Sequence, residues 1–152
     1  PSSLVLTRQA LPAQPRQAGQ IAAIRRGGYV LRDADRVDLI LIATGSEVAL
    51  AIAAADALAA KGHGVRVVSM PCPTVFAAQD AAWREAVLPA AIRHRIAIEA
   101  GVTETWHRWV GTAGRVVGLD TFGKSAPAKD LFQHFGFTPE RIAKEALELL
   151  GA

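Results

Sequence analysis

Short apolar runs alternate with longer amphipathic stretches along most of the chain. The runs that predict strands are residues 29–31, at an expected sheet edge, and 38–43, 65–70, 95–99 and 116–119. The stretches that predict helices are residues 46–61, 77–87, 103–110, 128–135 and 139–150. Such alternation is typical of βαβ units, whose sheets are mostly parallel and covered on both faces. The pattern predicts an α/β fold, a three-layer sandwich with a mostly parallel sheet of about five strands and helices on both faces.

Residues 1–27 follow a different pattern. Residues 3–7 alternate between apolar and polar side chains and predict a strand. Pro12 and Pro15 then stand among polar residues, as in a linker. A short helical stretch at residues 18–26 ends at a pair of glycines, after which the regular α/β pattern begins.

These changes divide the chain into three parts. Residues 1–9 are expected to end a preceding domain, residues 10–27 to form a linker with a short helix, and residues 28–152 to form a complete α/β domain. The chain begins at Pro1, without an initiator methionine and next to an expected strand. We therefore interpret the sequence as a piece of a longer protein; a processed tag is the alternative.

Length, hydropathy and the number of cysteines and histidines limit the classes of protein to which this chain can belong. The 152 residues fit one domain, and a mean hydropathy of +0.21 comes with apolar runs no longer than a strand. A membrane protein is therefore not expected.

Cys72 is the single cysteine, which excludes an internal disulfide and a cysteine metal cluster, and no signal peptide is recognised. The four histidines lack ligand spacing, so no metal site is expected. A cytoplasmic setting follows as the expectation.

The charge balance does not indicate a nucleic-acid partner. The formal net charge is +3 and the isoelectric point about 9.5. The basic residues are scattered, however, and no helix-turn-helix, RNP or arginine-rich signature is present. A mildly basic surface is still compatible with small phosphorylated molecules.

The segment Thr44-Gly45-Ser46-Glu47 is the first candidate for chemistry, because it follows an apolar strand and opens a helix. Ligands of parallel sheets gather at this edge, and a helix N-terminus offers free N–H groups to anions. Thr44 and Glu47 also have capping-box spacing, and a glutamate repels phosphate. Neither nucleotide-binding glycine motif is present. We interpret the segment as a helix cap.

The other candidates have equally structural interpretations. Glu99 ends another strand at the same edge, where a lone glutamate is more often a hydrogen-bonded support than a catalyst. His107 stands between Trp106 and Trp109, and such an aromatic cluster packs internally or forms an interface. Ser125 lies outside a G-x-S-x-G motif and is expected to turn the chain. Composition and spacing alone thus leave the function open.

Several segments, in their order and spacing, resemble the carboxy-terminal third of transketolases over essentially the whole chain. They are Thr7-Arg8-Gln9, Arg26-Gly27-Gly28-Tyr29-Val30-Leu31, Ile42-Ala43-Thr44-Gly45-Ser46-Glu47-Val48, Val68-Ser69-Met70-Pro71, Val87-Leu88-Pro89, Glu99-Ala100-Gly101, Trp106 through Gly111, Phe122-Gly123-Lys124-Ser125-Ala126-Pro127 and Phe135-Gly136-Phe137-Thr138.

The resemblance implies an enzyme of three domains that acts as a homodimer. Transketolases move a two-carbon ketol unit between sugar phosphates in the pentose phosphate pathway. Their first two domains hold thiamine diphosphate and the divalent metal, Mg²⁺. This chain has no G-D-G cofactor motif, so it should bind neither cofactor nor metal, contribute no catalytic residue and be inactive alone. The remaining transketolase domains are its expected partners.

Arg8 is the one site residue that the resemblance carries over. In Thr7-Arg8-Gln9 it matches the arginine with which transketolases grip the substrate's phosphate. A guanidinium suits this role because it makes charged, bidentate hydrogen bonds to phosphate oxygens. The alternative is a solvated arginine after a strand.

Two other classes of function stay open at this point. The first is the related domain of another thiamine-diphosphate enzyme, either a 2-oxo-acid dehydrogenase beta subunit or a deoxyxylulose-phosphate synthase. Residues 122–127 and 135–138 favour transketolase itself. The second is a free-standing regulatory or interaction module that binds a small anion at the rim of the sheet.

Overall fold

The computed structural model describes residues 3–151 and contains one five-stranded sheet. The strand order is β1-β3-β2-β4-β5, with only β1 antiparallel to its neighbour. The strands are β1 (Tyr29–Arg32), β2 (Leu39–Ala43), β3 (Val65–Ser69), β4 (Arg95–Ile98) and β5 (Arg115–Val117). The predicted α/β sandwich with a mostly parallel sheet is confirmed.

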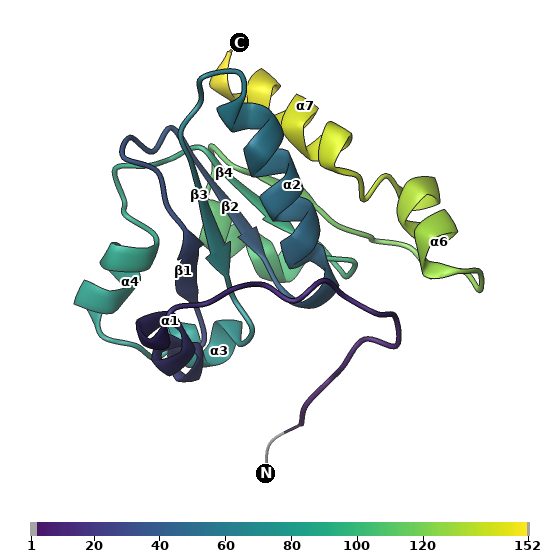
Figure 1. Cartoon of the computed structure of the whole chain (residues 1–152), viewed down its shortest axis with the longest axis horizontal. Coiled ribbons are helices and arrows are strands. Elements are labelled where there is room, and N and C mark those ends of the chain that lie inside the picture. Colours follow the sequence, from purple (N-terminus) through teal and green to yellow (C-terminus); the bar gives the residue numbers. More distant parts are fainter. Residues whose placement is uncertain (1–2, 152) are drawn as a thin grey trace.

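Helices cover both faces of the sheet. The α-helices are α1 (Ala18–Ala23), α2 (Val48–Ala59), α3 (Pro73–Ala77), α4 (Ala81–Val87), α5 (His107–Val110), α6 (Ala128–Phe135) and α7 (Pro139–Leu150). Short 3-10 turns end α1 and precede α2 and α5, at Ile24–Arg26, Gly45–Glu47 and Glu104–Trp106. The long helices α2 and α7 lie side by side on one face (Figure 1). Helices α3, α4 and α5 pack on the other face. No helix within residues 3–151 has the length and hydropathy that crossing a membrane requires.

Strand β2 separates two hydrophobic cores. All five of its residues are buried, as expected of a central strand covered on both faces. Leu39 and Leu41 join the core beneath α2 and α7. Ile40 and Ile42 point the other way and join the core that contains Phe76 of α3. This alternation follows from the two-residue period of a strand.

Helix α7 shows how local sequence fixes an element's bounds. The Thr138 hydroxyl accepts a hydrogen bond from the Arg141 backbone N–H at 3.3 Å, and Pro139 occupies the first turn. Ile142 and Ala146 are fully buried against the core. The predicted bounds of this helix and its Thr138 cap are both confirmed.

Two expected elements differ in the structure. Residues 3–7 form no strand; Leu4 and Val5 are 89% and 95% exposed. A strand requires a ladder partner, and this segment pairs with none among the described residues. The helix expected over residues 77–87 begins only at Ala81, because Asp80 caps it by accepting a 2.7 Å bond from the Trp83 N–H; residue 77 ends the preceding helix α3.

The order of the strands in the sheet changes side at β2. From β2 the chain passes through α2 to β3 on one side, whereas β4 lies on the other side of β2. The connection after β2 covers one face, and the connection after β4, through α5, covers the other. In open α/β sheets, such a switch point leaves a crevice at the carboxyl ends of the two strands. The fold therefore places its most accessible site between the ends of β2 and β4.

Candidate functional site

A cleft of about 580 Å³ lies at this switch point. Figure 1 shows the N-terminal stretch below the arrowheads of β2 and β3. Residues 3–7 of this stretch form the outer wall of the cleft. We call this the acidic cleft, because two carboxylates and no cationic side chain line it. Its lining is Ser3, Leu4, Val5, Leu6, Thr7, Thr44, Gly45, Ser46, Glu47, Pro71 and Glu99.

Glu47 is a buried carboxylate on the wall of the acidic cleft. Its residue is only 4% exposed. The Ser46 hydroxyl donates a hydrogen bond of 2.8 Å to Glu47 Oε1. Burial raises the pKa of the Glu47 carboxyl, and the charge of Glu99 adds to the increase, while the Ser46 bond opposes it. Burial therefore disfavours the charged form of Glu47.

Glu99 enters the same cleft from the end of β4 but is better supported. Its Oε2 accepts a hydrogen bond from Trp106 Nε1. Trp106 is 2% exposed and belongs to the core shared by α3, α4 and α5. The indole thereby fixes the carboxylate to a rigid part of the molecule. The interpretation of Glu99 as a hydrogen-bonded support is confirmed.

The predicted capping box at Thr44 and Glu47 is wrong. Thr44 has the extended backbone of a cap residue (φ −133°, ψ 159°), but its hydroxyl makes no cap hydrogen bond. The Glu47 N–H bonds instead to the Thr44 carbonyl at 3.1 Å, because a 3-10 turn opens the helix. The Glu47 side chain turns to Ser46 and into the acidic cleft. The polar groups of this segment are thus available at the cleft.

The arrangement suits positively charged or hydrogen-bond-donating groups. Two carboxylates attract such groups and repel phosphate, and no lysine or arginine lines the acidic cleft to offset them. Within residues 3–151 no three side chains of histidine, cysteine, aspartate or glutamate are grouped to hold a metal ion. The cleft therefore does not fit a diphosphate or a sugar phosphate.

Arg8 lies outside the acidic cleft, one residue beyond the segment that lines it. Its side chain is exposed at a bend, and no described residue makes a hydrogen bond or ion pair with it. Its neighbours are linked by a bond from the Thr7 hydroxyl to the Gln9 side chain. The structure does not bring Arg8 together with Glu47 or Glu99, and its substrate-binding role stays a prediction.

Sequence reasoning placed Glu47 and Glu99 at the same edge of the sheet but missed that they line one cleft. The two residues stand far apart in the chain, and only the strand order places both at one crevice. The indole of Trp106 was likewise recognised as an aromatic group and not as the partner of Glu99. The signal that could have found the pair was available: both residues follow apolar strands, at the edge where ligands of α/β sheets gather.

Known proteins match this chain over nearly its whole length. The profile of the transketolase-like TK C-terminal domain matches residues 27–138. Transketolase 1 of Vibrio cholerae is 58% identical over 151 residues, which are 99% of this chain and 23% of that protein. Transketolase 2 of Pasteurella multocida is 56% identical over 154 residues, with the same coverage of 99% and 23%. The chain thus spans less than a quarter of the length of these relatives.

Solved structures agree with the sequence matches. The transketolase from Leishmania mexicana superposes with a TM-score of 0.80 at 40% identity, over 86% of this chain and 19% of that chain. The Pichia stipitis transketolase in complex with sedoheptulose-7-phosphate superposes with a TM-score of 0.79 at 34% identity, again over 86% and 19%. The arrangement of strands and helices is therefore shared with these proteins.

Proposed function

The chain belongs to the transketolase family, and from this premise we propose that it works as the carboxy-terminal domain of a transketolase. The whole enzyme would transfer a two-carbon ketol unit between sugar phosphates of the pentose phosphate pathway. The observation that carries the proposal is the 58% identity to transketolase 1 of Vibrio cholerae, which covers 99% of this chain. The proposal makes the other transketolase domains its partners, a homodimer its assembly and the cytoplasm its location.

In this proposal the other domains hold thiamine diphosphate and Mg²⁺, which supply the chemistry of the two-carbon transfer. The residues present here do not fit thiamine diphosphate, and within residues 3–151 no three ligating side chains are grouped to hold Mg²⁺. The acidic cleft offers Glu47 and Glu99 without a cationic side chain, which is the wrong charge for a diphosphate. We therefore expect this chain to be inactive alone and to act by supporting and completing the rest of the enzyme.

Residues 1–9 would belong to the domain before this one. Leu4, Val5 and Leu6 are 89%, 95% and 82% exposed, an arrangement that is unfavourable for three apolar side chains in water. A neighbouring sheet would bury them and supply the missing ladder partner. Arg8 follows directly, with its guanidinium free to contact a substrate phosphate. The exposed apolar segment thus supports the proposed domain boundary.

A graft tests the proposed function. The corresponding segment of Vibrio cholerae transketolase 1 is replaced by this chain, and ketol transfer is measured with thiamine diphosphate, Mg²⁺ and pentose phosphates. We expect the graft to turn over and the 152-residue chain alone not to. A dimeric, folded graft without activity would contradict the proposal.

The matched control is the graft with Gly64→Val. A Cβ at Gly64 would lie 1.6 Å from the Arg36 carbonyl oxygen, so this domain should not fold normally. Loss of activity in the control would show that turnover depends on this domain.

Arg8 provides a separate test in the active graft. Arg8→Ala should raise KM for phosphorylated sugars by tenfold to a hundredfold, since a charged hydrogen bond contributes about 1.5–3 kcal/mol. Unphosphorylated acceptors should be affected far less. Arg8→Lys is the matched control and should recover part of the loss, because it keeps the charge but not the bidentate geometry. An equal loss for both kinds of sugar would exclude a role in phosphate binding.

A further inference from the structure

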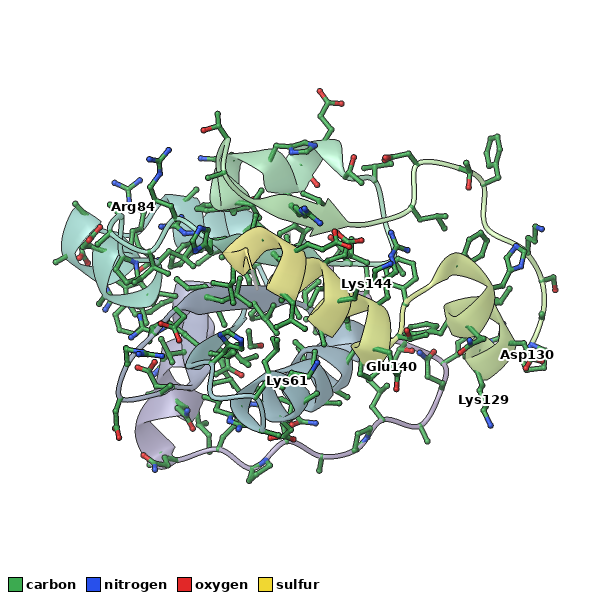
Figure 2. The ribbon with its side chains drawn as sticks, turned by 90° about the horizontal axis from the view of Figure 1, so that it is seen from above. Lys61, Arg84, Lys129, Asp130, Glu140 and Lys144 are labelled. Atoms are coloured by element: carbon green, nitrogen blue, oxygen red, sulfur yellow. The ribbon has the colours of Figure 1, made fainter. Side chains whose placement is uncertain are left out.

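A second cavity, of about 320 Å³, lies beside α4 and α5, on the face of the sheet opposite α2 and α7. We call it the arginine cavity, because Arg84, Arg95 and Arg108 all line it, with Glu85 as the one carboxylate of its lining. Figure 2 shows Arg84 at the opposite end of the molecule from Lys129 and Asp130 of α6. The volume is at the lower end of the range for small-molecule sites, roughly 300–1,000 Å³.

The three guanidinium groups differ in how their donors are used. Arg95 donates to the carbonyls of Ile92 (2.9 Å), Trp109 (2.9 Å), Leu88 (3.2 Å) and Pro89 (2.8 Å). Carbonyl oxygens satisfy its N–H groups but leave its positive charge unneutralised. Arg84 and Arg108 are exposed; Arg84 has one long bond of 3.5 Å to the Ala77 carbonyl. The described residues give Arg108 no hydrogen bond, so both of these side chains have donors to offer.

Trp109, which also lines the arginine cavity, carries an unused neutral donor. Its Nε1 is the one buried side-chain nitrogen or oxygen of residues 3–151 without a hydrogen-bond partner. The other two indoles are satisfied: Trp83 Nε1 donates to the Gly28 carbonyl at 3.1 Å, and Trp106 Nε1 donates to Glu99. A buried donor without a partner costs free energy, so an acceptor at this position would stabilise the molecule.

The Trp109 ring packs against the core, and the exposed side chain of Arg108 lies over it. Trp109 is 8% exposed and packs against Phe76, with ring centroids 5.2 Å apart. The Arg108 guanidinium carbon lies 4.6 Å from the centroid of the Trp109 ring, within the range of a cation–π contact. Because Arg108 is exposed and bound to nothing else, it can turn to admit a ligand beside the indole.

We propose that the arginine cavity binds a small oxyanion, a phosphate or carboxylate group of a metabolite. Arg84 and Arg108 are the charged donors, Trp109 Nε1–H is the neutral donor, and Arg95 adds a fixed positive charge. A water molecule would satisfy the indole equally well, but it leaves the charged donors of Arg84 and Arg108 without an acceptor of opposite charge. Guanidinium groups match the planar oxygen pairs of phosphate and carboxylate, which favours an oxyanion.

The three indole signals of the ¹⁵N-labelled 152-residue chain test the proposal directly. They are assigned by Trp→Phe variants and followed by NMR while inorganic phosphate replaces chloride at constant ionic strength. The Trp109 Nε1–H signal should shift saturably, with half-saturation at millimolar concentration or below, while those of Trp83 and Trp106 stay in place. A parallel titration with acetate distinguishes phosphate from carboxylate ligands, and saturable binding of either one supports the proposal.

Substitutions of charged residues test whether these side chains bind the anion. Arg84→Gln combined with Arg108→Gln should weaken binding by about tenfold or more, since two charged donors are lost. Glu85→Gln should strengthen it, because the change removes a repelling charge and keeps an acceptor for the Ala90 N–H, now 3.0 Å from Glu85 Oε1. Arg93→Gln is the matched control, an exposed arginine outside the lining that should change nothing.

Three results would overturn the proposal. They are no shift of the Trp109 signal with either anion, an equal shift of all three indole signals, and a Trp109 shift that persists unchanged in the Arg84→Gln, Arg108→Gln double variant. Arg95 is left unaltered in these experiments, because its four bonds to carbonyls make it part of the fold.

Discussion

The acidic cleft and the arginine cavity hold their buried charges in different ways. In the acidic cleft, Glu47 is 4% exposed and receives one side-chain hydrogen bond, from Ser46. In the arginine cavity, Arg95 donates to four backbone carbonyls. Burial raises the pKa of Glu47 and lowers the pKa of Arg95, so it disfavours both charges. The four carbonyl bonds nevertheless let the Arg95 guanidinium tie together the chain around it. The effect of a buried charged residue on stability therefore depends on the hydrogen bonds that the residue makes.

Among substitutions at these two sites, Arg95→Met should have the largest effect on stability. Methionine keeps much of the volume but leaves the carbonyls of Leu88, Pro89, Ile92 and Trp109 without their donor. Hydrogen bonds to charged groups contribute about 1.5–3 kcal/mol, and water can replace part of the loss at this half-buried site. We expect the free energy of unfolding to fall by about 2–4 kcal/mol, measured as a lower urea midpoint at constant m-value.

Arg93→Met is the matched control for this variant. Arg93 is exposed, and the described residues give it no hydrogen bond or ion pair. Its substitution should change the free energy of unfolding by no more than about 0.5 kcal/mol. Equal effects at the two positions would show that the carbonyl bonds of Arg95 contribute nothing to stability.

The sequence predicted most elements of the fold because local signals agree with the tertiary structure. Helix α7 has a capping threonine, a proline in its first turn and an apolar stripe, and its predicted bounds are those observed. Strand β2 has an uninterrupted apolar run and is buried throughout. The strand expected at residues 3–7 has its own alternation but no partner among the described residues. Local pattern thus predicts an element only where the required neighbour is present.

Glu47→Gln should stabilise the protein at neutral pH. Glutamine keeps an acceptor for the Ser46 hydroxyl and removes a charge that burial destabilises. The free energy of unfolding should rise by about 0.5–2 kcal/mol, the range of single stabilising substitutions. Thermal or urea unfolding of the two proteins side by side measures the difference.

The pH dependence of the difference in unfolding free energy between the original protein and Glu47→Gln identifies the cause of that difference. The pKa of Glu47 is raised by burial above its ordinary value of 4.5, so the native state binds this proton more tightly than the unfolded state. Its contribution to stability is fully present below that ordinary pKa and is lost as pH rises through the native pKa. The advantage of Glu47→Gln should therefore appear on going from acid to neutral pH. A variant that is less stable at neutral pH would show that the carboxylate makes a favourable interaction.

The two sites were not equally predictable. Thr44, Glu47 and Glu99 each follow or lie close to an apolar strand, so their place at the carboxyl edge was predictable, although their mutual arrangement was not. The arginine cavity joins residues of α3, α4, β4 and α5. No spacing along the chain relates these elements, because the crossovers from β3 to β4 and from β4 to β5 together bring them to one place. Arg8, by contrast, was singled out by family resemblance.

The smallest predicted effect is that of Thr44→Val, and Thr138→Val is its matched comparison. Both threonines occupy the cap position of a helix or turn with extended backbone, but only the Thr138 hydroxyl accepts a backbone hydrogen bond, from Arg141 at 3.3 Å. Loss of a cap costs about 0.5–2 kcal/mol, so Thr138→Val should lower the urea midpoint measurably. Thr44→Val removes no such bond and should change the free energy of unfolding by less than about 0.5 kcal/mol. Equal losses in the two variants would mean that Thr44 caps its helix after all, which would leave the acidic cleft with one free hydroxyl fewer.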